Sequence, residues 1–151
     1  MRHSQEFCEI MDRLIPFVRE RYELWRNVSD EVLRDYCAWF WNRGLLIWRE
    51  KDGLITGVAI FRYFKTLDDF LDLANSDQEG GAFGWAELFV ADSLETFNSL
   101  WSEVLEQGGI PEVIMWDRGD RTLNGTPRMY RRDQIQKMAR RLSHGFTTKT
   151  A

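Results

Sequence analysis

The sequence predicts one α+β domain, because its length suits a single core and its hydrophobic spacing changes along the chain. The chain has 151 residues, of which 44% are hydrophobic and 29% are charged. A chain of this length buries about 68–70% of the surface that its unfolded form exposes, so it can form a core without metals or disulfides. Helical spacing comes first, and strand-type spacing follows from residue 45. Disordered, collagen-like and low-complexity proteins are excluded.

Two helices are expected before the first strand. Apolar residues over 4–25 recur every three or four positions and form one stripe of an amphipathic helix. Pro16 should kink this helix or divide it in two, because proline removes a backbone donor and clashes with the preceding turn. Ser29 can cap a second helix with its buried face over 32–40, and Gly44 suits the left-handed residue after its last turn.

A β-hairpin follows the second helix. Runs rich in apolar, β-branched and aromatic residues cover 45–49 and 54–64, and the turn sequence Lys51-Asp52-Gly53 separates them. The acidic stretch 65–82 should be a connection that contains one short helix with a Thr66 cap.

A third strand, a central helix and a further strand come next. Residues 83–90 are apolar apart from Glu87, and an isolated acid in such a strand must face water or be specially solvated. Ser93 can start a helix that ends at Gly108-Gly109, and 110–116 form a strand. Helical spacing over 130–142 predicts a last helix with basic residues around most of its surface. The predicted order is α-α-β-β-β-α-β-α.

Charge is distributed unevenly along the chain. The formal net charge is −4, but residues 1–116 carry 11 basic and 21 acidic side chains (net −10), whereas residues 117–151 carry 9 and 3 (net +6). The chain is therefore expected to be an acidic body that ends in a basic tail.

A soluble, cytoplasmic protein is expected. Cys8 and Cys37 lie at apolar positions of the predicted helices, which favours buried free thiols in a reducing compartment. No apolar run approaches the roughly 18 residues that span a bilayer, and the first residues lack the apolar core of a signal peptide. No membrane partner is predicted.

The predicted order of elements is similar to that of the GNAT acetyltransferase superfamily. Residues 54–60 (Leu-Ile-Thr-Gly-Val-Ala-Ile) resemble the family's third-strand pattern of two apolar residues, any residue, Gly, an apolar residue and Ala. Residues 87–90 (Glu-Leu-Phe-Val) resemble the end of the fourth strand, and 124–130 are similar in spacing to a late asparagine-to-tyrosine segment. The resemblance covers 4–130 and implies two N-terminal helices, an antiparallel meander, a central helix, a further strand and a basic C-terminal helix.

This resemblance implies a GNAT-like domain over 1–127, with a basic helix and tail over 128–151 docked on it or on a partner. GNAT enzymes hold the acetyl-CoA pyrophosphate on backbone amides before the central helix. The corresponding loop here, 91–95, has no glycine and contains Asp92 and Glu95. Two carboxylates there oppose an anionic ligand unless they point away. The family's first strand and last two strands are not apparent either, so a shortened scaffold without a cofactor is expected.

The resemblance also implies two catalytic residues if the chain is an enzyme. Glu87 would be the general base, and Tyr130 would be the general acid that protonates the departing thiolate. In the alternative interpretation, Glu87 is a solvent-facing strand residue and Tyr130 packs on the sheet. Zinc-ligand and phosphate-loop patterns are absent from the sequence, so no metal is predicted.

The basic tail is the remaining candidate site. Its proposed partner-binding residues are Arg128, Arg131, Arg132, Lys137, Arg140 and Arg141. These side chains could dock a partner protein or contact nucleic-acid phosphates, or they could neutralise the chain's own acidic body or that of a second copy.

Three functional hypotheses follow. The leading one is a non-enzymatic binding or assembly protein on a degenerate GNAT-like scaffold. At the level of fold it resembles the small GNAT-like proteins of tailed phages, including internal virion components, so the virion is an alternative location. The second is an atypical acetyl-CoA-dependent N-acyltransferase, and the third is an electrostatic nucleic-acid binder.

Overall fold

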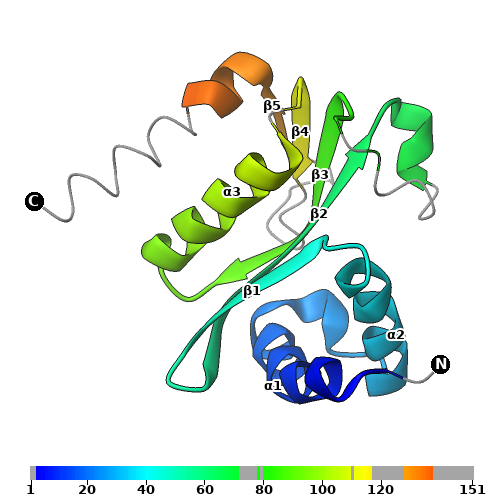
Figure 1. Cartoon of the computed structure of the whole chain (residues 1–151), viewed down its shortest axis with the longest axis vertical. Coiled ribbons are helices and arrows are strands. Elements are labelled where there is room, and N and C mark those ends of the chain that lie inside the picture. Colours follow the sequence, from blue (N-terminus) through cyan, green and yellow to red (C-terminus); the bar gives the residue numbers. More distant parts are fainter. Residues whose placement is uncertain (1–2, 72–77, 79, 110, 117–127, 138–151) are drawn as a thin grey trace, which may run out of the picture.

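A five-stranded mixed sheet carries the two N-terminal helices on one face and the central helix on the other (Figure 1). The computed structural model describes residues 3–71, 78, 80–109, 111–116 and 128–137. The strands lie in chain order across the sheet: β1 (Leu46–Lys51), β2 (Leu54–Phe64), β3 (Phe83–Ala91), β4 (Val113–Trp116) and β5 (Arg128–Arg131). The predicted α+β class is confirmed.

The first helix, α1 (Gln5–Arg21), is continuous. The Ser4 side chain caps it by accepting a hydrogen bond from the Phe7 amide. Of the two alternatives expected at Pro16, the division into two helices is wrong, because helix continues on both sides of this residue. Pro16 is exposed, so the carbonyl that loses its helical partner there can bond to water instead. A short 3-10 helix, η1 (Glu23–Trp25), replaces the expected last turn.

The second helix, α2 (Asp30–Trp41), has the predicted ends. The Ser29 hydroxyl accepts a hydrogen bond from the Val32 amide at 3.3 Å, which satisfies one of the free donors of the first turn. Gly44 has a φ of +70°, a left-handed conformation that a glycine adopts without strain.

The hairpin of β1 and β2 is confirmed, and β3 pairs with β2 on its other side, also antiparallel. The turn between β1 and β2 contains Asp52 and Gly53, which both have positive φ. This conformation matches the right-handed twist of the two strands. The expected short helix in the acidic connection is η2 (Leu67–Leu71), where the Thr66 hydroxyl bonds to the Asp69 carboxylate.

The central helix, α3 (Leu94–Gly108), is capped by Ser93 and followed by Gly109 at a φ of +78°. It carries the chain to β4, which pairs in parallel with β3. The last helix begins later than predicted, because residues 128–131 form β5, antiparallel to β4, and helix starts at residue 132. The first residues of the predicted basic segment therefore belong to the sheet.

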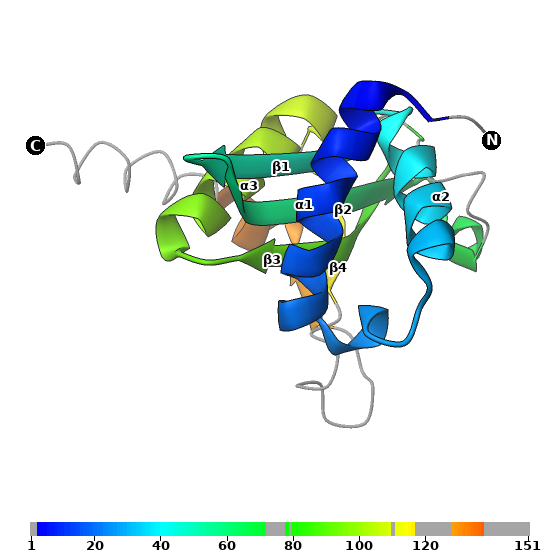
Figure 2. The same cartoon turned by 90° about the horizontal axis from the view of Figure 1, so that it is seen from below.

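Two hydrophobic cores occupy the two faces of the sheet, and α1 crosses the first face in front of β1, β2 and β3 (Figure 2). The first core, under α1 and α2, includes Phe7, Leu14, Phe40, Val58 and Ile60. The second core, under α3, includes Phe61, Tyr63, Trp101, Ile114 and Ile135.

The expectation that both cysteines are buried free thiols is confirmed for one of them. Cys37 is a buried free thiol, as predicted, whereas Cys8 is half-buried and also free. In the part of the chain that the structure describes, no helix combines the length and the apolar character needed to cross a membrane.

Candidate functional site

Glu87 lies at an irregular point of β3. Ile60 of β2 pairs with Leu88 and Phe61 pairs with Ala86, so Glu87 is an extra residue without a partner on β2. Such a β-bulge re-aims the side chain at the extra position. Among the described residues, the last pair of the parallel β3–β4 ladder is Ala86 with Trp116, immediately before Glu87. The bulge therefore coincides with the end of the described β3–β4 ladder.

The carboxylate of Glu87 is held by two side chains on the face of the sheet that α1 and α2 cover. The Tyr36 hydroxyl, from α2, donates a hydrogen bond to Oε1 at 2.5 Å. The Arg62 Nη1, from β2, donates to Oε2 at 3.3 Å. The Glu87 side chain is 22% exposed and that of Arg62 only 7%. Glu87 is thus the counter-ion of a buried arginine, which neither sequence-based interpretation anticipated.

Burial and the charge of Glu87 both keep Tyr36 protonated. Burial is the larger cause of a strongly raised pKa of the Tyr36 phenol, and the neighbouring Glu87 carboxylate raises this pKa further. The phenol therefore remains the donor of this hydrogen bond throughout the neutral pH range. This arrangement fixes the orientation of Glu87.

Tyr36 and Arg62 were not identified from the sequence. Arg62 is the only charged residue of the predicted strand 54–64, and a lone charge in an apolar strand was the signal available. Tyr36 had no such signal, because a tyrosine on the apolar face of a helix is typical of a core residue.

Tyr130 lies on the other face of the sheet. It belongs to β5, opposite Ile114, and packs against the core under α3. The alternative interpretation, an aromatic residue packed on the sheet, describes this placement. Since Glu87 bonds to Tyr36 on the opposite face, the structure does not bring the two candidate catalytic residues together.

The loop between β3 and α3 is closely tied to its surroundings. The Asp92 amide donates to the Thr56 carbonyl at 2.9 Å, and the Thr96 amide donates to the Ser93 hydroxyl at 3.1 Å. The start of α3 also packs directly on β2, because a Cβ added to Gly57 would lie 2.6 Å from Cγ2 of Thr96. Two amides that an anion could use at this helix start are therefore already engaged.

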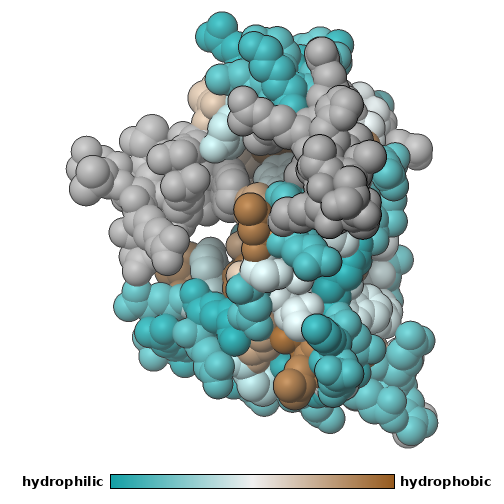
Figure 3. All heavy atoms as spheres, turned by 90° about the vertical axis from the view of Figure 1, so that its left-hand side faces the viewer, coloured by the Kyte–Doolittle hydropathy of each residue, from teal (hydrophilic) through white to brown (hydrophobic). Residues whose placement is uncertain are grey.

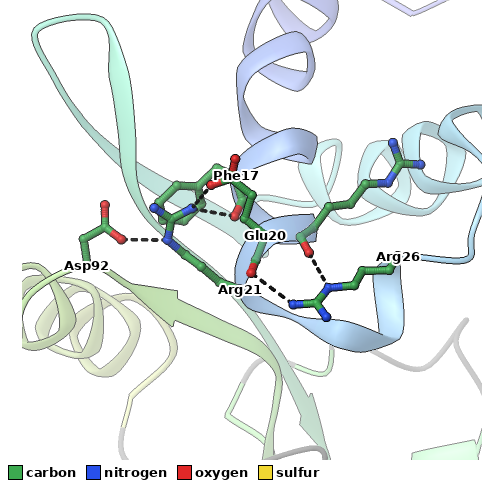
Figure 4. A network of polar contacts seen from close by, with 6 residues as sticks. Phe17, Glu20, Arg21, Arg26 and Asp92 are labelled. Carbon is green, nitrogen blue, oxygen red and sulfur yellow. Dashed lines mark hydrogen bonds and ion pairs between the residues drawn. The ribbon is translucent and has the colours of Figure 1, made fainter.

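One of the two acids of this loop is neutralised by α1 (Figure 4). The Asp92 carboxylate accepts a hydrogen bond from Nε of Arg21 at 2.7 Å. Arg21 also donates to the Phe17 carbonyl and lies over the Phe17 ring, with its Cζ 3.9 Å from the ring centroid. The expected repulsion of an anion by Asp92 is consequently weaker than the sequence indicated, whereas Glu95 is exposed.

The network around Arg21 extends to the end of α1. Arg26 donates to the carbonyls of Arg19 and Glu20, also drawn in Figure 4. These carbonyls belong to the last turn of the helix, where they have no helical partner. The network therefore joins the end of α1 to η1 and to the loop before α3.

The described basic residues of the C-terminal segment are exposed and lack acidic partners. Arg131, Arg132 and Lys137 are exposed, and none of them pairs with a carboxylate among the described residues. The backbone of Arg128 lies in β5, and Arg140 and Arg141 lie outside the described residues. In the body, by contrast, arginines pair with carboxylates at Arg13, Arg19, Arg21, Arg34, Arg49 and Arg62.

Neither a search for metal ligands nor a comparison with known proteins assigns a function to the site. Across the described ranges, no three His, Cys, Asp or Glu side chains gather as they would around a metal ion. No protein-family model matches the chain, and no curated protein matches it.

Proposed function

We propose that this chain is a non-enzymatic binding or assembly protein on a degenerate GNAT-like scaffold. The separation of the two candidate catalytic residues carries this proposal. Both carboxylate oxygens of Glu87 accept hydrogen bonds, from Tyr36 and Arg62, and Tyr130 lies on the opposite face of the sheet. A base and an acid that act on one substrate must both reach its reacting atoms.

The loop before α3 supports the absence of the cofactor. Asp92 and Thr96 each donate their amide to a group of the chain itself, and Glu95 adds an exposed carboxylate. A pyrophosphate at this helix start would have to displace these bonds and approach a like charge. The scaffold part of the proposal is supported by the antiparallel meander β1–β2–β3 and by the parallel β4 that follows α3.

Binding through the C-terminal segment is the second part of the proposal. Arg131, Arg132 and Lys137 are exposed and have no acidic partner in the described part of the chain, so their charges are available to another molecule. Figure 3, which shows the side that faces left in Figure 1, has only small brown areas separated by hydrophilic side chains. The coloured part of that face shows no large apolar patch, so charge is the better basis for recognition there.

The acyltransferase alternative retains one supporting observation. The last β3–β4 pair in the described residues is Ala86 with Trp116, so Glu87 follows that pair directly on β3. Calorimetric titration distinguishes the two functions, with acetyl-CoA raised to about 1 mM, the upper end of typical Michaelis constants. We expect no saturable heat. Saturable micromolar binding, absent with free acetate, would overturn the non-enzymatic proposal.

The nucleic-acid alternative needs substitutions rather than a truncation at residue 128. Removing 128–151 would delete β5 and so disturb the sheet. The variant with Arg131, Arg132 and Lys137 all changed to Gln keeps the backbone and removes three positive charges. Duplex DNA binding is measured at about 50 and 200 mM salt. If the unchanged chain binds DNA and the triple variant loses both affinity and salt dependence, the nucleic-acid function replaces protein binding.

A further inference from the structure

We propose that the outer edge of β5 binds an acidic, extended segment of another protein as an additional strand of the sheet. This inference rests on the proposed binding function and names its surface and its class of partner. Strand addition uses main-chain hydrogen bonds for affinity and alternate side chains for specificity. The argument depends on the position of β5, on the side chains of this strand and on their charge.

β5 is the last strand of the sheet. It pairs with β4 on one side, and in the described part of the chain no strand lies on its other side. An edge strand presents unpaired amide and carbonyl groups, which are a template for another extended chain. The Arg131 amide of β5 already donates to Oε1 of Gln134 at 2.9 Å, so a strand that uses this amide would displace the Gln134 side chain.

The side chains of β5 differ between its two faces. Tyr130 packs against the core under α3, so its neighbours Met129 and Arg131 point to the opposite face, because successive side chains of a strand alternate. Met129 is 61% exposed, and Arg131 is also exposed. A strand added beside β5 would therefore meet one apolar and one basic side chain on this face.

Charge selects an acidic strand rather than a second copy of β5. If two copies of β5 paired antiparallel about their centre, Arg128 of each copy would lie opposite Arg131 of the other. Like charges directly opposite each other destabilise a strand pair, whereas opposite charges stabilise it. Since Arg131 and Arg132 have no carboxylate among the described residues, an acidic segment supplies the missing partner. The same charges reject basic segments and so contribute to specificity.

The test uses the full chain and a fluorescein-labelled peptide, acetyl-Glu-Val-Glu-Val-Glu-Val-amide, in fluorescence anisotropy titrations. Two isomers carry N-methyl groups on either the Glu amides or the Val amides. Successive amides of an extended peptide point to opposite edges, so a peptide added to one strand uses only one of the two sets. We expect one isomer to bind about tenfold more weakly than the unmodified peptide and the other to bind nearly as well.

Variants test the charge part of the proposal. Arg131→Glu should weaken the binding of the unmodified peptide by about tenfold or more, because it replaces attraction by repulsion at the edge of β5. Lys51→Glu is the matched control, since Lys51 is exposed on β1, the strand at the opposite edge, and should have no effect. Far-UV circular dichroism checks that both variants fold, and the comparison of the isomers on the unchanged chain needs no variant.

Several outcomes would overturn the proposal. If both N-methylated isomers bind as tightly as the unmodified peptide, the peptide is attracted by charge alone. If both isomers lose affinity equally, the peptide does not lie along an edge. A concentration-dependent dimer that excludes the peptide would make a second copy the occupant. Absence of peptide binding would reject strand addition, whereas the acetyl-CoA titration separately tests the non-enzymatic function.

Discussion

Substitution of Glu87 tests whether this residue is a structural counter-ion. In Glu87→Ala, Arg62 would keep a positive charge inside the protein with only 7% of its side chain exposed. Removal of one partner from a buried ion pair costs about 3–5 kcal/mol, and the 22% exposure of Glu87 places the expected loss near the lower value. A loss of about 3 kcal/mol lowers Tm by roughly 6–12 °C in a chain of this size.

Urea unfolding, followed by tryptophan fluorescence, measures this loss. The second variant, Glu87→Ala with Arg62→Met, also removes the buried arginine charge that lost the Glu87 carboxylate, so it should recover part of the stability. Tyr36→Phe removes only the hydrogen bond and should cost about 1.5–3 kcal/mol, the range for a bond to a charged group. A loss below about 1 kcal/mol in Glu87→Ala, or no recovery in the double variant, would refute the counter-ion interpretation.

Two further predictions concern packing and pH. Gly57→Ala should cost about 1–3 kcal/mol in urea unfolding, because the added Cβ would lie 2.6 Å from Cγ2 of Thr96 and 2.9 Å from Cδ1 of Leu100. Thr96→Ser in the same background relieves only the first contact and should restore part of the stability, and an unchanged midpoint in Gly57→Ala would contradict the close packing. Burial raises the pKa of the Cys37 thiol from 9.0 to about 12, so above pH 9 the unfolded chain loses a proton that the folded chain keeps, and stability falls as pH rises. Between pH 9 and 10 this loss is about 1 kcal/mol, because the unfolded thiol is only half deprotonated at pH 9. It should be absent from Cys37→Ala in urea unfolding under reducing conditions, whereas parallel pH profiles of the two chains would exclude it.

Local signals were sufficient to predict most elements of the fold. Ser29 and Ser93 start helices, and Gly44 and Gly109 follow their ends in left-handed conformations. Each signal acts within a few residues, so it can be read directly from the sequence. The expected division at Pro16 is wrong because Leu14 and Val18, on either side of it, are both buried in the first core, and the local sequence does not report that packing.

The site and the last strand depend on contacts between distant residues. Tyr36 meets Glu87 across 51 positions, and the bulge that re-aims Glu87 is a property of the pairing between β2 and β3. Nothing within either segment reports that register. β5 is four residues long, and its pairing with β4 outweighs the helical spacing that begins at Tyr130.

The division of the core into two has a consequence for the order of folding. All buried members of the first core except Leu88 come from residues 7–60, and all buried members of the second come from residues 61–135. The boundary falls between Ile60 and Phe61, adjacent residues that point to opposite faces of β2. The first core comes from the shorter stretch of chain, and shorter loops cost less entropy to close. We therefore expect the N-terminal half to assemble first and the C-terminal half to dock onto a sheet already begun. Sequence changes in the later half would then leave the earlier unit intact, which frees the β5 end to diverge toward different partners.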